Sequence, residues 1–164
     1  EQELFNDLIV KSDYCVAGFS YGPQKPFEYV YESENYIERL ILISPAFFQT
    51  QSSAFVRTQL RYFNVDQEAY VKQFLKNVAY PSKFDLSPYL NLGSQEDLNA
   101  LLTYVWDADK IREVLDRGVI IEVFLGTQDK IINAEDALAF FDPLVTTYYS
   151  KDTGHIQQAK EEKK

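Results

Sequence analysis

Four short, continuous apolar runs, separated from one another by helical patterns, limit the folds that this sequence can adopt. The runs are Tyr14–Ala17, Arg39–Ile43, Val119–Leu125 and Val145–Tyr149. A strand that is apolar at every position, rather than at every second one, is typical of a parallel sheet covered on both faces. Helical patterns over 3–10, 27–36 and 134–141 can supply such cover. The sequence therefore predicts an α/β fold with a mostly parallel sheet flanked by helices.

The interval between the second and third runs is long and breaks this alternation. Helical patterns cover Ser53–Phe63, Glu68–Asn77, Gln95–Trp106 and Ala108–Arg117, and a proline-containing loop covers 80–93. We predict a helical insertion over about 46–108, which either caps a site or adds packing. The length of 164 residues supports a single domain over 1–158, followed by a flexible Lys/Glu-rich tail at 159–164.

Charge and composition exclude several classes of protein. The formal net charge of −9 argues against binding to the phosphate backbone of nucleic acids. No apolar stretch approaches the roughly 20 residues that a membrane-spanning helix requires. The single cysteine, Cys15, fits a reducing compartment, and packing is its expected role. We expect a cytoplasmic domain that uses no metal or cofactor and binds neither nucleic acid nor membrane.

The pentapeptide Gly18–Gly22 has the form G-x-S-x-G at the end of the first predicted strand. In a nucleophile elbow the serine, here Ser20, lies on a tight strand-to-helix turn, so the residues two positions away must be small. The following helix directs its N-terminus toward the reacting carbonyl. The same pattern also occurs in ordinary glycine-flanked turns. A buried strand before the motif and a helix after it favour the nucleophile.

His155 is the only histidine of the chain, and it follows the last predicted strand. A lone histidine near a terminus is often an exposed tail residue. The position of His155 after Ser20 and beyond the final strand instead matches the chain order Ser, Asp, His of α/β-hydrolase triads. His155 is therefore the candidate base.

Asp129 follows the Val119–Leu125 run and is the candidate acid. A carboxylate in this loop can bind the far nitrogen of His155, which holds its tautomer and stabilises the imidazolium. A turn or N-cap aspartate is the alternative interpretation. Asp152 is too close to His155 in sequence to reach that nitrogen easily, and Asp107 and Asp109 lie in helical patterns.

Together these residues predict an esterase-like triad. Ser20, Asp129 and His155 each follow the carboxyl end of a different predicted strand. Ligands collect at that edge of an open α/β sheet.

The motifs as a set resemble one particular family of short α/β-hydrolases. They are Gly-Phe-Ser-Tyr-Gly, Leu-Ile-Leu-Ile-Ser-Pro-Ala, Val-Ile-Ile-Glu-Val-Phe-Leu-Gly-Thr-Gln-Asp-Lys-Ile and Asp-Thr-Gly-His. With only nineteen residues before Ser20, the chain resembles the pimelyl-[acyl-carrier protein] methyl ester esterases of the BioV type, from about Glu1 to Gln158.

This resemblance implies hydrolysis of the methyl ester of pimelyl-acyl-carrier protein during biotin synthesis. It implies Ser20, Asp129 and His155 as the triad and the backbone N–H of Tyr21 as one oxyanion donor. Members of the family begin with a short strand and loop that supply the second donor. The chain contains no methionine, so we expect that N-terminal segment to be missing here.

The implied substrate is carried on an acidic protein, although this chain is itself acidic. Docking then requires a local basic patch. Arg57/Arg61 and Lys72/Lys76 are two i,i+4 pairs in the predicted insertion and are candidates for carrier-protein binding. Plain solvated helix faces are the alternative interpretation.

Two other functions compete with this one. A hydrolase of the same mechanism could act on a small free ester or thioester. A non-catalytic binding module on a hydrolase scaffold is the second, but the intact serine, aspartate and histidine argue against it.

Overall fold

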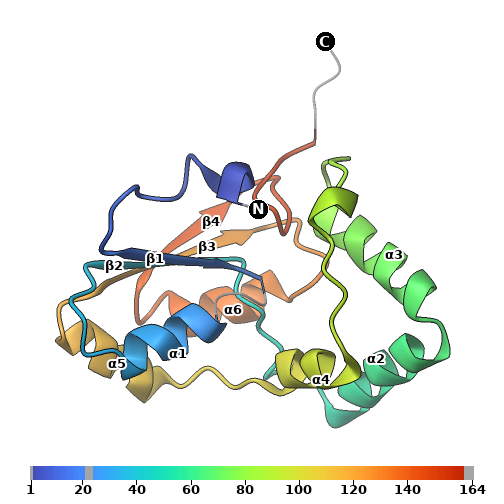
Figure 1. Cartoon of the computed structure of the whole chain (residues 1–164), viewed down its shortest axis with the longest axis horizontal. Helices are drawn as coiled ribbons and strands as arrows, with labels where there is room; N and C mark the ends of the chain where they lie inside the picture. The colour runs from blue at the N-terminus through green and yellow to red at the C-terminus, as the bar shows by residue number, and fades with distance from the viewer. Residues whose placement is uncertain (1, 21–23, 161–164) are drawn as a thin grey trace.

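The central element is a four-stranded parallel sheet (Figure 1). The computed structural model describes residues 2–20 and 24–160. In order across the sheet, the strands are β1 (Cys15–Phe19), β2 (Arg39–Ile43), β3 (Ile120–Gly126) and β4 (Thr146–Ser150). Because all four run in the same direction, their carboxyl ends meet at one edge. The predicted α/β fold with a parallel sheet flanked by helices is confirmed.

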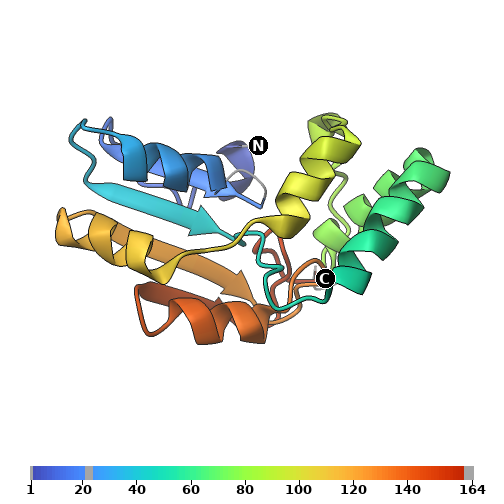
Figure 2. The same cartoon turned by 90° about the horizontal axis from the view of Figure 1, so that it is seen from below.

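One face of the sheet carries the main hydrophobic core. Three helices pack on it: α1 (Gln24–Glu32), α5 (Ala108–Asp116) and α6 (Ala134–Phe141) (Figure 2). The side chains of β2 and β3 that point to this face are fully buried, among them Leu40 and Val123, each 0% exposed. Burial of apolar side chains against these helices drives the layering.

The opposite face is covered more thinly, which corrects one expectation. The short 3-10 helix η1 (Gln2–Phe5) and the chain after it, rather than a longer helix over 3–10, pack against Ile41 and Ile43. Among the described residues β1 and β4 are edge strands. The first apolar run is therefore half-buried along β1, and β4 is mostly exposed, because neither strand has neighbours on both sides.

Cys15 lies on this thinly covered face. Its side chain is half-buried against the cluster of Phe5, Ile41 and Ile43, and burial raises the pKa of the thiol. The structure therefore agrees with a packing role for this cysteine.

The helices between β2 and α5 lie beside the carboxyl edge of the sheet (Figure 1). They are α2 (Ser53–Val65), α3 (Gln67–Ala79), η2 (Ser87–Tyr89) and α4 (Gln95–Thr103). Side chains of Ser52, Asp66 and Ser94 cap the three α-helices by accepting backbone N–H groups. We refer to residues 46–107, between β2 and α5, as the insertion.

Candidate active site

Ser20 lies directly after β1, in a backbone conformation that few side chains adopt. Its φ is +54°, in the left-handed region. The turn is held to the neighbouring strand, because the Ser20 N–H donates to the Ile43 carbonyl at 3.0 Å and the Ser20 carbonyl accepts from the Ala46 N–H at 3.1 Å. A strained turn between a strand and a helix is the geometry that a nucleophile elbow requires.

The imidazole of His155 lies between Ser20 and Asp129. Its Nε2 is 2.7 Å from the Ser20 hydroxyl oxygen, and its Nδ1 is 2.6 Å from Oδ2 of Asp129. The side chains of His155 and Asp129 are both fully shielded from solvent. The structure thus brings together the three residues predicted from the sequence, within the hydrogen-bonding distances that a nucleophile, base and acid need.

Asp129 is oriented by its own loop. Its Oδ1 accepts the backbone N–H groups of Ile131 at 2.7 Å and Ile132 at 3.1 Å, which leaves Oδ2 free to face the histidine. Hydrogen bonds from backbone N–H groups stabilise a charged carboxylate in a buried place. Asp129 is therefore a turn aspartate as well as the partner of His155. The turn holds Oδ1 and directs Oδ2 toward the histidine.

The rival aspartates lie elsewhere. Asp152 is exposed, in a left-handed turn with φ of +61°. Asp107 is the N-cap of α5 and accepts the backbone N–H groups of Asp109 and Lys110. These positions leave Asp129 as the carboxylate that faces His155.

Two glycines allow the loops around His155 to pack closely. A Cβ atom at Gly154 would overlap the backbone carbonyl of Tyr80, in the insertion. A Cβ at Gly126, at the end of β3, would overlap the carbonyl oxygens of Thr153 and Gly154. Neither requirement was recognised from the sequence, because both depend on contacts between distant segments.

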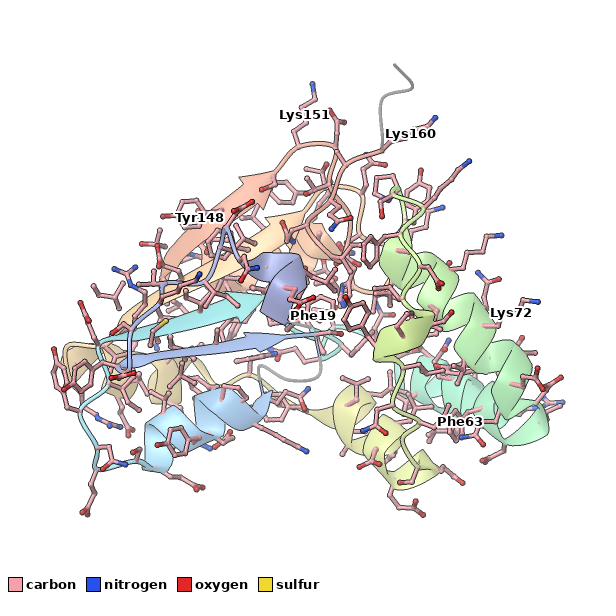
Figure 3. All side chains as sticks on the ribbon, turned by 45° about the horizontal axis from the view of Figure 1, so that its top comes forward. Phe19, Phe63, Lys72, Tyr148, Lys151 and Lys160 are labelled. Atoms are coloured by element: carbon pink, nitrogen blue, oxygen red, sulfur yellow. The ribbon has the colours of Figure 1, made fainter. Side chains whose placement is uncertain are left out.

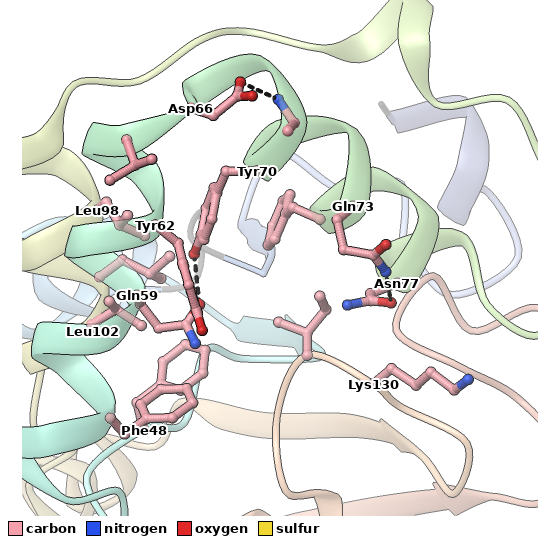
Figure 4. Close-up of a pocket in the computed structure, with 16 residues that line it drawn as sticks. Phe48, Gln59, Tyr62, Asp66, Tyr70, Gln73, Asn77, Leu98, Leu102 and Lys130 are labelled. Carbon is pink, nitrogen blue, oxygen red and sulfur yellow. Dashed lines mark hydrogen bonds between the residues drawn. The ribbon is translucent and has the colours of Figure 1, made fainter.

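A cavity of about 530 Å³ lies between the insertion and the sheet edge (Figure 4). Phe48, after β2, and Lys130 and Ile131, directly after Asp129, line it from loops at the sheet edge. The rest comes from α2, α3 and α4, with side chains that are mainly apolar: Phe55, Tyr62, Phe74, Leu98, Leu101 and Leu102. Ser20 and His155 are not among its described lining residues, and the Asp129 loop is the segment that joins the cavity to the triad.

Two pairs of polar side chains interrupt the apolar lining. The Tyr70 hydroxyl donates to Gln59 Oε1 at 3.0 Å, which links α3 to α2, and Gln73 Nε2 donates to Asn77 Oδ1 at 2.9 Å along α3 (Figure 4). An apolar cavity with a few fixed polar groups is the usual form of a small-molecule site. Apart from the predicted helical insertion, no pattern in the sequence indicated this cavity.

The predicted binding residues have separate outcomes. Tyr21, the expected oxyanion donor, lies outside the described residues. Arg57 and Arg61 are exposed on α2, and the Arg57 guanidinium donates to Ser53 Oγ at 3.2 Å within the same helix. Lys72 and Lys76 are exposed on α3, and Lys72 projects away from the sheet (Figure 3). None of the four lines the cavity as described.

The described residues contain no cluster of three or more His, Cys, Asp or Glu side chains that could hold a metal ion. Within the same residues, no helix has the length and apolar character needed to cross a membrane.

Comparison with known proteins yields structural but not sequence relatives. No protein-family model and no curated protein matches the chain. Solved structures do match. One is carboxylesterase CesB from Bacillus subtilis, which is 17% identical in sequence and has a TM-score of 0.60. The match covers 94% of this chain and 57% of that one. Naproxen esterase from the same organism has 18% identity and a TM-score of 0.58, with the same two coverages.

MenH from S. aureus is a third structural neighbour, with 16% identity and a TM-score of 0.58, over 88% of this chain and 62% of that one. The chain thus spans less than two thirds of the length of each of these proteins. At these identities the likeness concerns the fold. The parallel sheet, its flanking helices and these neighbours together show that the chain has an α/β-hydrolase fold.

Proposed function

We propose that this protein is a serine carboxylesterase that hydrolyses the methyl ester of pimelyl-acyl-carrier protein. The observation that carries the proposal is the continuous hydrogen-bonded arrangement of Ser20, His155 and Asp129 at the carboxyl edge of the sheet. The esterase names of the structural neighbours support the general reaction. The pimelyl substrate rests on the motif resemblance.

In the proposed reaction the Ser20 hydroxyl attacks the ester carbonyl while His155 Nε2 accepts its proton. The backbone N–H of Tyr21 stabilises the oxyanion that forms. The tetrahedral intermediate then collapses, and His155 gives the proton to the methoxy oxygen. Methanol departs, and the acyl group stays bound to Ser20. Water, deprotonated by His155, then releases the free carboxylate and restores the Ser20 hydroxyl. Asp129 stabilises the imidazolium in both halves.

The cavity beside the triad is our candidate for the acyl chain. Apolar side chains such as Leu101 and Phe74 suit the methylene groups of a pimelyl chain. The volume of about 530 Å³ lies within the range of roughly 300–1,000 Å³ that small-molecule sites occupy. The insertion would then serve as a cap over the substrate.

We further propose that the partner is an acidic acyl-carrier protein, bound in the cytoplasm. Arg57, Arg61, Lys72 and Lys76 are exposed on neighbouring helices of the insertion, as a docking patch requires. Because the whole chain carries −9, attraction to an acidic partner has to come from such a local cluster.

Mass spectrometry tests the substrate directly. Pimelyl-acyl-carrier protein methyl ester is incubated with the protein, and the carrier mass is followed over time. We expect a species that is lighter by one methylene unit, with matching release of methanol. A carrier mass that stays unchanged, while a small soluble ester is hydrolysed, would refute the proposed substrate.

A hydrolase of small free esters or thioesters is the second candidate. The mainly apolar cavity favours it, since such a lining fits a small ester without any carrier. Turnover of a short nitrophenyl ester and of the carrier-bound methyl ester, measured side by side, separates the two. The first candidate requires the higher kcat/KM on the carrier-bound ester.

A further inference from the structure

Ser44 is a buried residue with an unusual backbone conformation at the end of β2. It is 0% exposed, and its φ is +44°, in the left-handed region that a residue with a Cβ atom rarely adopts. Its N–H donates to the Phe124 carbonyl at 2.8 Å, which fixes Ser44 to the neighbouring strand β3. This position, in the Ile-Ser-Pro segment after the strand, has no role in the reaction described above.

The Ser44 hydroxyl links the sheet to the loop that carries the histidine. It donates to the backbone carbonyl of His155 at 2.6 Å and accepts from Nε2 of Gln157 at 2.8 Å. The same Gln157 amide also approaches the Phe124 carbonyl at 3.4 Å. The hydroxyl therefore uses both its donor and its acceptor capacity on one loop, more than a hundred residues away in sequence.

Backbone hydrogen bonds hold this loop on either side of the histidine, Ile156 packs in a core cluster, and the His155 ring packs beside Phe19. The Gln128 N–H donates to the Thr153 carbonyl at 2.8 Å, and the Gly154 N–H donates to the Gln158 carbonyl at 3.2 Å. The first of these bonds ties the loop to the segment after β3 and the second closes the loop on itself, while the Ser44 hydroxyl ties the His155 carbonyl to the end of β2. Because the imidazole must reach two partners at once, a small shift of its main chain disturbs at least one of its two hydrogen bonds.

We infer that Ser44 is a positioning residue, which fixes the main chain of His155 so that the imidazole spans Ser20 and Asp129. The inference rests on the proposed hydrolase mechanism and adds to it a group that touches no substrate. A displacement of about 1 Å in a reacting group can cost on the order of a hundredfold in rate. Loss of the Ser44 hydroxyl is therefore expected to lower kcat about tenfold to a hundredfold, with KM nearly unchanged.

The test compares Ser44→Ala with Ser82→Ala. Alanine retains the Cβ atom, so the backbone preference at position 44 changes little and the hydroxyl alone is lost. Ser82 is a matched control: it is 8% exposed, and its hydroxyl donates to the Ala79 carbonyl at 2.7 Å, within the insertion. Kinetics on a short nitrophenyl ester and thermal melting are measured for both variants.

A readout on the histidine itself is available because the chain contains one histidine. In protein labelled with ¹⁵N-histidine, every imidazole signal belongs to His155. We expect Ser44→Ala to shift or broaden the Nδ1–H signal that reports the bond to Asp129, and Ser82→Ala to leave it in place. Wild-type ring signals and wild-type kcat in Ser44→Ala would overturn the inference.

A second variant, Gln157→Leu, covers the case in which Ser44→Ala does not fold. This variant keeps the Ser44 hydroxyl and removes the amide that donates to it and to the Phe124 carbonyl. A smaller shift of the same ring signal is then expected, and an unchanged signal would again overturn the inference. If the wild-type protein hydrolyses no ester, the proposed function fails. The ring signals of the variants still decide whether Ser44 positions the histidine.

Discussion

The carboxyl edge of the sheet and the helices α2 and α3 of the insertion beside it are built very differently. Strands β2 and β3 bury most of their side chains completely, and the candidate triad is held by hydrogen bonds of 2.6 and 2.7 Å. Helix α2 has no buried residue, and α3 buries only Val78 and Ala79 near its end. The candidate triad therefore lies at the well-buried sheet edge, and lightly packed helices line much of the cavity.

This difference separates two demands on an enzyme. Groups that transfer protons have to stay within a few tenths of an ångström of their partners, which a buried sheet edge can ensure. Side chains that select a substrate tolerate more variation, and lightly packed helices open at lower free-energy cost than a core. We expect substitutions at the sheet edge to change the rate or the stability, and substitutions in the insertion to change substrate preference.

The largest effect is expected at Ser20. Ser20→Ala removes the proposed nucleophile, and hydrolysis of any ester should fall by about four to six orders of magnitude. The melting temperature should stay near that of the wild type, because the hydroxyl contributes no core packing. Initial rates and a thermal melt on the same sample check both points. Retention of more than a few per cent of the activity would reject Ser20 as the nucleophile.

Asp129→Asn should have the next largest effect. The amide can donate to Nδ1 and favours the wrong imidazole tautomer, so kcat should fall by about ten-thousandfold. Asp152→Asn is the matched control, since Asp152 is exposed and three residues from His155. Rate measurements on both variants decide the assignment. A loss of kcat in Asp152→Asn, with an unchanged kcat in Asp129→Asn, would make Asp152 the acid.

Stability provides a third contrast between the two regions. Leu125→Ala, in β3 with a fully buried side chain, should lower the free energy of unfolding by about 2–5 kcal/mol. Leu60→Ala, on the half-buried side of α2, should lower it by about 1 kcal/mol. Urea unfolding of the two variants measures the difference. Equal losses would mean that α2 is packed as tightly as the sheet.

The smallest effect is expected from the surface of the insertion. Exchanging Arg57 and Arg61 for Glu should raise KM for a carrier-bound ester severalfold and leave a soluble ester unaffected. The defect should shrink with added salt, because screening limits exposed charges to about 8 Å at physiological ionic strength. Arg112→Glu, on α5, is the control for a charge change elsewhere. Steady-state kinetics at low and high salt give the comparison.

Equal loss on both substrates in the Arg57/Arg61 variant would indicate damage to the cavity. Unchanged kinetics on both substrates would mean that the two arginines are part of an ordinary solvated helix face.

Local patterns in the sequence accounted for much of the fold. The run Arg39–Ile43 and the helix over 134–141 have the predicted bounds, because strong apolar patterns end at clear turn residues. Parallel strands bring their carboxyl ends together, and this rule was enough to predict that Ser20, Asp129 and His155 would meet. The half-buried state of β1 was not predictable in this way, since it depends on the strand's place in the sheet.

The remaining features of the site arise from contacts between segments that are distant in the chain. Nothing near Ser44 in sequence indicates that its hydroxyl meets the His155 carbonyl. The need for glycine at 154 follows from the Tyr80 carbonyl, in the insertion. The cavity likewise depends on how α2, α3 and α4 lie beside the sheet, and apolar helical patterns do not specify this placement.

Covalent labelling shows whether Ser20 is an activated nucleophile. The wild-type protein is treated with a fluorophosphonate, digested, and searched by mass spectrometry for the modified peptide. We expect one adduct, on Ser20, with strongly slowed formation in Asp129→Asn. An unlabelled Ser20 in folded protein, or an adduct on another serine that persists in Ser20→Ala, would contradict this assignment of the nucleophile.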